Sequence, residues 1–188
     1  MRIKLKTVQF RRKREGKTNY NKRRDMLKTD RARVVVRPTL KNIIVQIVQY
    51  QPTGDKVLVG LTSQSLDKLG WVVHKGNLPA AYLTGYLLGK KAVKQGVTEA
   101  VLDTGLLQPI KGSKIYACVK GMRDAGVDVP VDEEVLPSEE RIRGEHIASY
   151  AKDNTDKFTD YAHKKVAPSS IASLFEKVKK AIEAHHEK

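Results

Sequence analysis

The stretch VVVRPTLKNIIVQIVQY, residues 34–50, decides the fold, because it contains two β-branched runs separated by a proline. Val34–Val36 predicts one strand, and Pro38 closes it, since proline has no N–H to donate to a sheet. Asn42–Tyr50 predicts a second strand, and a turn containing Pro and Gly leads to a third at Lys56–Thr62. Short connections join antiparallel neighbours, so the three strands should form a meander.

A helix is expected after the meander, at about residues 78–95, because Asn77 suits a helix N-cap and Pro79 suits the first turn. Gly85 and Gly89 lie four residues apart and therefore on one face of this helix. Their lack of side chains should let the helix approach the sheet closely. In a membrane the same spacing would favour helix pairing, but the apolar segment is too short to span a bilayer.

A strand–helix–strand unit completes the predicted body. Thr98–Asp103 should follow the helix as a fourth strand, and such a unit in one sheet makes a parallel, right-handed crossover. Ser113 suits the N-cap of a second helix, Lys114–Ala125, with Cys118 on its inward face. The sequence therefore predicts an α/β protein with a mixed sheet, in which three antiparallel strands precede a parallel βα unit.

The C-terminal part, residues 127–188, begins with an acidic segment and ends in helices. Residues 128–140 contain six Asp and Glu and no Lys or Arg, so we expect them to face solvent or a basic protein. Ser138 suits the start of one helix. A last helix at about residues 170–186 is predicted by one apolar stripe, formed by Ile171, Leu174, Phe175, Val178 and Ile182. That stripe could dock on the body or on a partner, and both alternatives stay open.

Positive charge is concentrated in an N-terminal arm, residues 1–33, which precedes the α/β core at residues 34–126. Residues 1–41 contain sixteen Lys and Arg and three Asp and Glu, a net charge of +13, while the whole chain carries +15. The rest of the chain is therefore nearly neutral. Because the arm has few apolar residues to bury, its charge indicates a polyanionic partner, either nucleic acid or an anionic membrane.

Two kinds of local structure are expected within the arm. Thr18 should cap a short helix from Asn19 to Lys28. The Phe10–Lys17 run shows neither a helical nor a strand period, so we expect it to be extended or disordered when free.

The residue types in the arm favour RNA as the polyanion. Arg and Lys neutralise phosphates, and Arg also stacks on bases. Phe10 and Tyr20 offer stacking surfaces among the basic residues, and Gly16 lets the backbone approach a phosphate. An arm that lies on a membrane would need a face rich in Leu, Phe and Trp, which is missing here. Composition alone does not distinguish RNA from DNA.

Composition also indicates the cellular compartment in which the protein resides. Cys118 is the single cysteine, so an intramolecular disulfide is excluded, and we expect its thiol to be a small core group in a reducing compartment. Residues 1–15 are basic and are not followed by the apolar run of a secretory signal. No stretch reaches the roughly 18–20 apolar residues that span a bilayer. We therefore expect a cytoplasmic protein.

Signals for catalysis are poor, and we expect no enzyme, metal or cofactor. Gly16–Thr18 matches the end of a phosphate-binding loop, but Arg11 stands where its first glycine should be. The five His are far apart or near the C-terminal end. The predicted layout is shared with ribonuclease-H-like nucleases, whose two Mg²⁺ ions need several carboxylates. Asp103 is suitably placed for this, but the central strands carry no acid, so a nuclease is disfavoured.

Five motifs resemble the archaeal and eukaryotic branch of one ribosomal family. They are FRRKREGKTNYNKRR, VVVRPTLKNIIVQIV, GNLPAAYLTGYLLGKKA, EAVLDTGLLQPIKGSKIYACVKGMRDAGVDVP and EERIRGEHIASYA, which occur in order over about residues 8–152. The chain is similar to the universal large-subunit ribosomal protein family eighteen, whose eukaryotic members carry the number five. The resemblance implies an α/β body of ribonuclease-H-like topology without catalytic activity.

The resemblance also implies partners and a site. The protein would bind 5S rRNA in the central protuberance of the large subunit, beside the large rRNA, the other 5S-binding protein and neighbouring ribosomal proteins. Carried onto this chain, the RNA-binding residues would be Phe10, Arg11, Arg12, Lys13, Arg14, Gly16, Lys17, Thr18, Tyr20, Lys22, Arg23, Arg24, Arg31, Arg33, Arg37, Thr39, Lys41 and Asn42. The loop at residues 63–65 is a weaker candidate. Two other hypotheses are a general basic RNA-binding or chaperone module and the nuclease.

Overall fold

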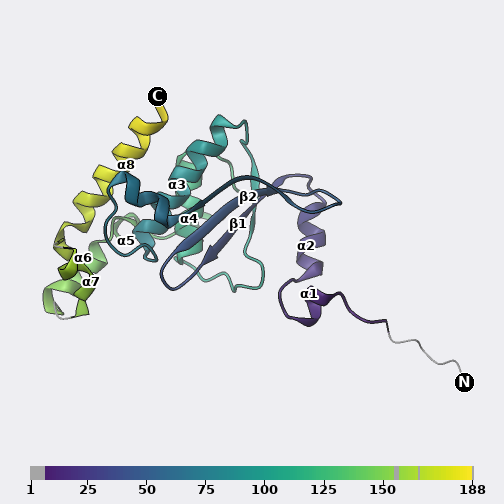
Figure 1. Ribbon diagram of the computed structural model, residues 1–188, viewed down its shortest axis with the longest axis horizontal. Helices are drawn as coiled ribbons and strands as arrows, with labels where there is room; N and C mark the ends of the chain where they lie inside the picture. The colour runs from purple at the N-terminus through teal and green to yellow at the C-terminus, as the bar shows by residue number, and fades with distance from the viewer. Residues whose placement is uncertain (1–6, 155–156, 165, 188) are drawn as a thin grey trace, which may run out of the picture.

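The computed structural model describes residues 7–154, 157–164 and 166–187, and its centre is a four-stranded sheet (Figure 1). The strands are β1 (Ala32–Pro38), β2 (Ile43–Gln49), β3 (Lys56–Thr62) and β4 (Ala100–Asp103), in the order β3-β2-β1-β4. The helices are α1 (Arg11–Arg14), α2 (Tyr20–Leu27), α3 (Leu78–Lys94), α4 (Lys114–Asp124), α5 (Glu139–Arg143), α6 (Glu145–Asp153), α7 (Thr159–His163) and α8 (Ile171–Glu187). Short 3-10 helices are η1 (Ser63–Leu69), η2 (Glu133–Val135) and η4 (Pro168–Ser170).

The register of the strands confirms the predicted mixed sheet. The centre of β1, Val35, faces Gln46 of the antiparallel strand β2 and Asp103 of the parallel strand β4. β2 pairs antiparallel with β3, with an irregularity between Ile47 and Val48. The β1–β2 connection is tight because Thr39 donates its backbone N–H to the Asn42 carbonyl at 2.7 Å. β4 returns beside β1 only after α3, as a strand–helix–strand crossover requires.

Two helices cover one face of the sheet and form the core with it. α3 begins where the sequence predicted, since Asn77 Oδ1 accepts the Ala80 N–H at 2.9 Å and Pro79 lies in the first turn. Val34, Ile43 and Ile47 of the sheet are fully buried in the same apolar cluster as α3 and α4. The strands are thus hydrophobic on the side that meets the helices.

The two glycines of α3 have a different partner from the one predicted. A Cβ added at Gly85 would lie 2.0 Å from the Cys118 carbonyl oxygen, and one added at Gly89 would lie 2.6 Å from the Ala125 Cβ. Gly121 of α4 makes the reciprocal approach to the backbone of Tyr82. The expectation that these glycines face the sheet is therefore wrong: they let α3 pack backbone to backbone against α4. Cys118, also in this contact, is buried as expected.

The last helix docks on the body, which resolves the alternative that the sequence left open. Ile171, Val178 and Ile182 of α8 are buried in the common core. Phe175 lies 5.4 Å from the Tyr82 ring of α3, measured between centroids, and Tyr86 donates its hydroxyl to Glu183 at 3.0 Å. Burial and the bond to Glu183 raise the pKa of Tyr86 to about 12, so its hydroxyl stays protonated as a donor. α8 therefore lies along α3 (Figure 1).

The acidic segment does not lie wholly in solvent at its start. The Asp128 backbone pairs with the chain just before β4, accepting from the Ala100 N–H at 2.9 Å and donating to the Thr98 carbonyl at 2.7 Å. Val127 and Val129 on either side are buried. No helix in the described part of the chain is both long and apolar enough to cross a membrane.

Candidate nucleic-acid interface

The arm is helical where an extended or disordered run was predicted. Residues 11–14 form the one-turn helix α1, in which Lys13 and Arg14 donate their N–H groups to the Phe10 carbonyl at 2.9 and 3.1 Å. Gly16 then turns the chain with a φ of +62°, which an L residue with a side chain rarely adopts. The prediction failed because a single turn stabilised by its own ends has no periodic apolar pattern to detect.

Local ion pairs hold this turn. Glu15 accepts from the Arg11 guanidinium at 2.7 Å and from the Lys17 ammonium at 2.8 Å. Hydrogen bonds from Lys17 and then Arg11 lower the pKa of Glu15, so its carboxylate remains ionised. A single acid therefore offsets part of the repulsion among the surrounding cations.

Helix α2 begins one residue later than predicted. Its N-cap is Asn19, whose Oδ1 accepts from the Asn21 and Lys22 N–H groups at 3.1 and 3.2 Å. Thr18, the predicted cap, instead accepts a hydrogen bond from Arg12 Nε at 2.8 Å. Asn is the better N-cap of the two residue types, so the residue ranking favoured the position that the structure shows. The Arg12–Thr18 bond fixes α1 relative to α2.

The two aromatic residues of the arm lie together. The rings of Phe10 and Tyr20 are 5.1 Å apart between centroids and tilted by 41°. Phe10 nevertheless remains largely exposed, so one apolar surface is presented among the basic residues. The structure thus combines the two predicted stacking residues into a single aromatic platform.

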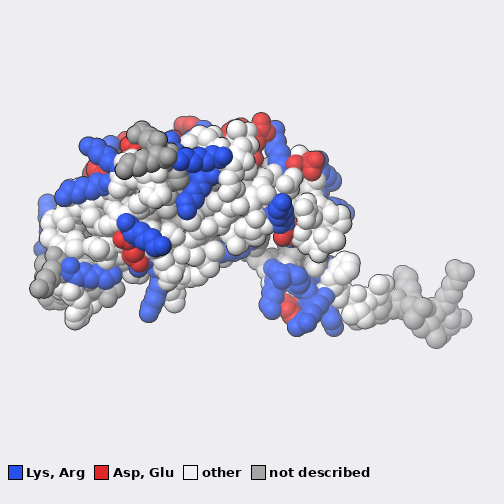
Figure 2. Space-filling model, turned by 45° about the horizontal axis from the view of Figure 1, so that its top comes forward, with Lys and Arg blue, Asp and Glu red and all other residues white. Residues whose placement is uncertain are grey.

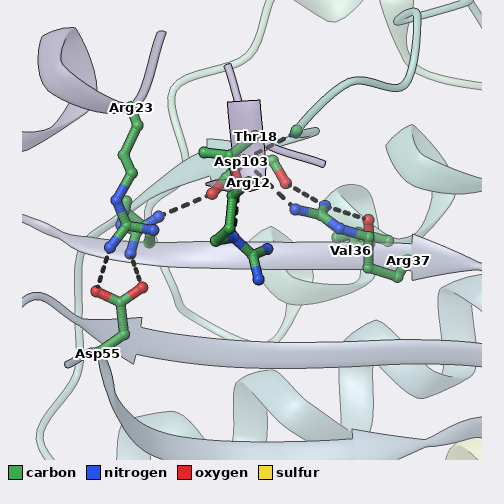
Figure 3. A network of polar contacts seen from close by, with 9 residues as sticks. Arg12, Thr18, Arg23, Val36, Arg37, Asp55 and Asp103 are labelled. Carbon is green, nitrogen blue, oxygen red and sulfur yellow. Dashed lines mark hydrogen bonds and ion pairs between the residues drawn. The ribbon is translucent and has the colours of Figure 1, made fainter. Parts of the chain in front are cut away.

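Helix α2 is anchored to the sheet through a carboxylate in the β2–β3 turn (Figure 3). Asp55 accepts from Arg23 of α2 at 2.7 Å and from Arg33 of β1 at 2.6 Å. Burial alone would raise the pKa of Asp55, but the hydrogen bonds from Arg33 and Arg23 outweigh it and lower the pKa below the usual range. The carboxylate therefore joins the arm to the body as an anion.

Arg33 extends this network to the fourth strand. Its side chain is only 2% exposed, and it donates to Asp103 at 2.9 Å. Arg37 donates to the backbone carbonyl of Asp103 at 2.8 Å, and the Gly105 N–H donates to Asp103 Oδ1 at 2.8 Å. The network therefore links α2, the β2–β3 turn and the end of β4 (Figure 3).

The same contacts bear on the nuclease hypothesis. That hypothesis depended on Asp103, whose carboxylate is here engaged by Arg33 and lies 3.6 Å from the Arg37 guanidinium. Within the described residues, no group of three or more His, Cys, Asp or Glu side chains is arranged to hold a metal ion. Asp103 is therefore placed as an ion-pair partner for arginines.

A hollow of about 370 Å³ lies between the arm helices and the end of β4. Five basic residues line it, Arg12, Lys17, Lys22, Arg23 and Arg37, together with the acids Asp25 and Asp103. Figure 2 shows the Lys and Arg side chains of the arm crowded together, whereas both signs of charge mix over the body. The geometry thus gives a basic concave surface that a polyanion could enter.

Six of the eighteen predicted RNA-binding residues line this hollow: Arg12, Lys17, Thr18, Lys22, Arg23 and Arg37. The following are exposed: Phe10, Arg11, Arg12, Lys13, Arg14, Gly16, Lys17, Lys22, Arg24, Arg31, Thr39 and Lys41. Five others are half-buried: Thr18, Tyr20, Arg23, Arg37 and Asn42. Thr39, Lys41 and Asn42 belong to the β1–β2 turn.

Arg33 differs from the other predicted site residues because its guanidinium is buried between two carboxylates. Ser63 of the weaker candidate loop is also buried, and its hydroxyl accepts the Ile43 N–H at 3.1 Å. Asn19 and Asp55 were missed as contributors to the site. Nothing local in the sequence marks Asp55, because its partner Arg23 is 32 residues away.

A basic helical arm fixed to an α/β body is typical of proteins that bind a polyanion. Comparison with known proteins shows which class of polyanion-binding protein this is. Residues 4–100 match the family described as "Ribosomal large subunit proteins 60S L5, and 50S L18".

Archaeal relatives cover almost the whole chain. The chain is 49% identical over 183 residues to "Large ribosomal subunit protein uL18" of Korarchaeum cryptofilum, covering 94% of each chain. It is 48% identical to the protein of that name from Methanosphaera stadtmanae and 46% identical to that from Thermofilum pendens, again covering 94% of each. The chain therefore belongs to this family of large-subunit ribosomal proteins, a family of structural constituents of the ribosome rather than of enzymes.

Proposed function

We propose that this protein binds 5S rRNA and anchors it in the central protuberance of the large subunit, beside the large rRNA and neighbouring ribosomal proteins. Membership of the large-subunit family supplies the ribosomal context. The single observation that carries the proposal is the fixed geometry of the arm. A basic surface held by the Arg23–Asp55 pair can recognise the shape of one folded RNA, whereas a loose tail supplies charge without geometry.

The contacts are assigned by position. Arg11, Arg12 and Arg14 on α1 and Lys22 on α2 neutralise backbone phosphates, because their side chains are exposed. The Phe10–Tyr20 platform stacks on an unstacked base, as single-stranded loops of RNA permit. The β1–β2 turn supplies a second, smaller group of contacts. Arg33 acts as a positioning residue, because its guanidinium is buried.

A salt titration of binding tests the proposal. The full chain is titrated with 5S rRNA and, in parallel, with an unrelated structured RNA of equal length, from low to near-physiological salt. If binding depends on charge neutralisation alone, the affinities for both RNAs should fall steeply, and by the same factor, as the salt concentration rises. A preference for 5S rRNA that survives near-physiological salt supports the proposal. Equal affinities that fade together would instead identify a general basic RNA-binding module.

A further inference from the structure

A second hollow, of about 430 Å³, lies at the opposite end of the molecule from the arm. It is formed by the chain just before α3 together with α6, α7, Lys157 and Phe158. In Figure 1, α6 and α7 lie at one end of the long axis and α1 and α2 at the other. The proposed function does not use this site.

Aromatic rings and one lysine form much of its wall. Tyr150 and Phe158 are 6.1 Å apart between ring centroids, and Phe158 meets Tyr161 edge to face at 5.5 Å. Lys157 donates to the Tyr150 hydroxyl at 2.9 Å, and its ammonium lies 5.6 Å from the Tyr150 ring centroid. Tyr150 is 49% exposed, so it is the ring most accessible from solvent.

A buried donor that has no partner among the described residues lies in the same wall. Asn77 uses its Oδ1 to cap α3, which fixes the orientation of the amide. Its Nδ2 is buried and has no hydrogen-bond partner among the residues that the structure describes. Buried polar groups are almost always hydrogen-bonded, so an acceptor on a ligand in the hollow would satisfy this N–H group.

The charges around the hollow indicate what kind of ligand brings that acceptor. Among the described lining residues, Lys157 is the one Lys or Arg, and none is Asp or Glu. Burial, together with the charge of Arg141, lowers the pKa of His146, so the imidazole is neutral at pH 7. The ligand that fits is thus planar and apolar on its faces, has acceptors at its edge and carries negative charge.

We propose that this hollow binds one unstacked nucleotide of ribosomal RNA, an inference that rests on the proposed function. The base lies against the aromatic wall at Tyr150 and Phe158, since stacking on aromatic side chains is how single unpaired bases are held. The Asn77 amide donates to an oxygen or ring nitrogen at the base edge, and Lys157 neutralises the adjoining phosphate. The protein would then hold RNA at both ends.

Zero-length crosslinking at 254 nm in assembled large subunits tests this proposal, with the crosslinked peptides mapped by mass spectrometry. The decisive variant is Asn77→Asp, because Asp caps a helix as well as Asn but has no N–H to donate. Tyr150→Ala removes the exposed ring. Tyr50→Ala is the matched control, since Tyr50 is 48% exposed and lies outside the hollow. Thermal unfolding of each purified variant verifies that it folds.

We expect RNA crosslinks in the peptide that contains Tyr150 and Phe158. Their yield should fall about tenfold with Tyr150→Ala, in line with the loss of one stacked base. Asn77→Asp should reduce the yield similarly, and Tyr50→Ala should leave it unchanged. Crosslinks in the arm but none at the hollow would overturn the inference alone, as would crosslinks from the hollow to a protein. Absence of RNA crosslinks in the arm would overturn the proposed function instead.

Discussion

The side chain of Arg33 lies buried beneath the proposed binding surface and pairs with two carboxylates. Its guanidinium is buried between Asp55, in the β2–β3 turn, and Asp103, at the end of β4. Because Asp55 also pairs with Arg23 of the arm, Arg33 connects the arm to β4. A buried cation is costly to desolvate and is stable only when such partners surround it. The network therefore favours one geometry of the surface.

Replacing Arg33 by Met should lower the free energy of unfolding by about 3–5 kcal/mol, the usual cost of removing one partner of a buried pair. The reason is that two carboxylates would then be left without their common cation. Urea unfolding of the full chain measures the change. Arg31→Met at an exposed position should cost no more than about 1 kcal/mol. Equal effects of the two variants would contradict a central role for Arg33.

Asp55 should give part of the protein's stability a dependence on pH. Because the folded state lowers the pKa of Asp55, ionised Asp55 stabilises the fold above its ordinary pKa of about 3.9. This stability is lost as the pH falls through the lowered pKa. Asp55→Asn should thus be less stable than the wild type at pH 7, by a margin that shrinks in acid.

Unfolding in urea between about pH 2.5 and pH 7 measures that margin. Asp30→Asn, which also removes one carboxylate but at an exposed position, serves as the control. A margin between the wild type and Asp55→Asn that stays constant down to the lowest pH would mean that the Asp55 ion pairs add nothing to stability.

Helices α3 and α4 illustrate, at the scale of an element, how sequence can reveal a close approach without its partner. The spacing of Gly85 and Gly89 correctly indicated a bare helix face. The spacing could not indicate which element packs against that face, because either a sheet or a second helix can pack closely on a helix face without side chains. The partner depends on Gly121 of α4, which approaches the α3 backbone from the other side.

Gly85→Ala should lower the free energy of unfolding by about 1–3 kcal/mol, the typical cost of overpacking a core. The added Cβ would meet the backbone of Cys118, which cannot move aside as a flexible side chain would. Thermal unfolding provides the measurement. Gly60→Ala is the control, since its Cβ would make ordinary contacts at 3.5 Å. A Gly85→Ala protein as stable as the control would show that the two helices can separate without cost.

For the whole molecule, the distribution of charge determines how it should respond to salt. Net charge of +13 lies in residues 1–41, out of +15 for the chain. α1 and α2 hold much of this charge at one end of the molecule (Figure 1). Binding to 5S rRNA should therefore depend on salt mainly through the arm.

Replacing Arg11, Arg12 and Arg14 together by Ala should weaken binding to 5S rRNA and flatten its salt dependence. The slope of log affinity against log salt should fall by up to about 0.9 for each phosphate that the variant no longer neutralises, a value for B-DNA that overestimates single strands. Filter binding over a range of salt measures the slope. The body variant Lys91→Ala, Lys94→Ala, Lys177→Ala removes equal charge and should keep the wild-type slope. A slope unchanged by the arm variant would show that α1 does not bind the RNA.

The sequence by itself determined the strands, their mixed pairing and the separation of charge. β-branched runs bounded by turn residues specify strands locally, and the crossover rule then orients β4. The basic character of the arm is likewise a property of composition. The single turn of α1 escaped prediction because it depends on a few bonds at its ends. Asn19 escaped because Thr18 is also an accepted N-cap type and helix ends vary by one or two residues.

Only the tertiary structure decided which charges meet. Arg33 pairs with Asp55, 22 residues away, and with Asp103, 70 residues away, because strand register and the β2–β3 turn bring them together. The second hollow likewise depends on α6 and α7 packing beside the chain before α3. The ion-pair partners of a buried residue such as Arg33 are set by the tertiary structure, because a buried charge needs a counter-charge within hydrogen-bonding distance. No local pattern of residues in the sequence specifies which charges will lie that close.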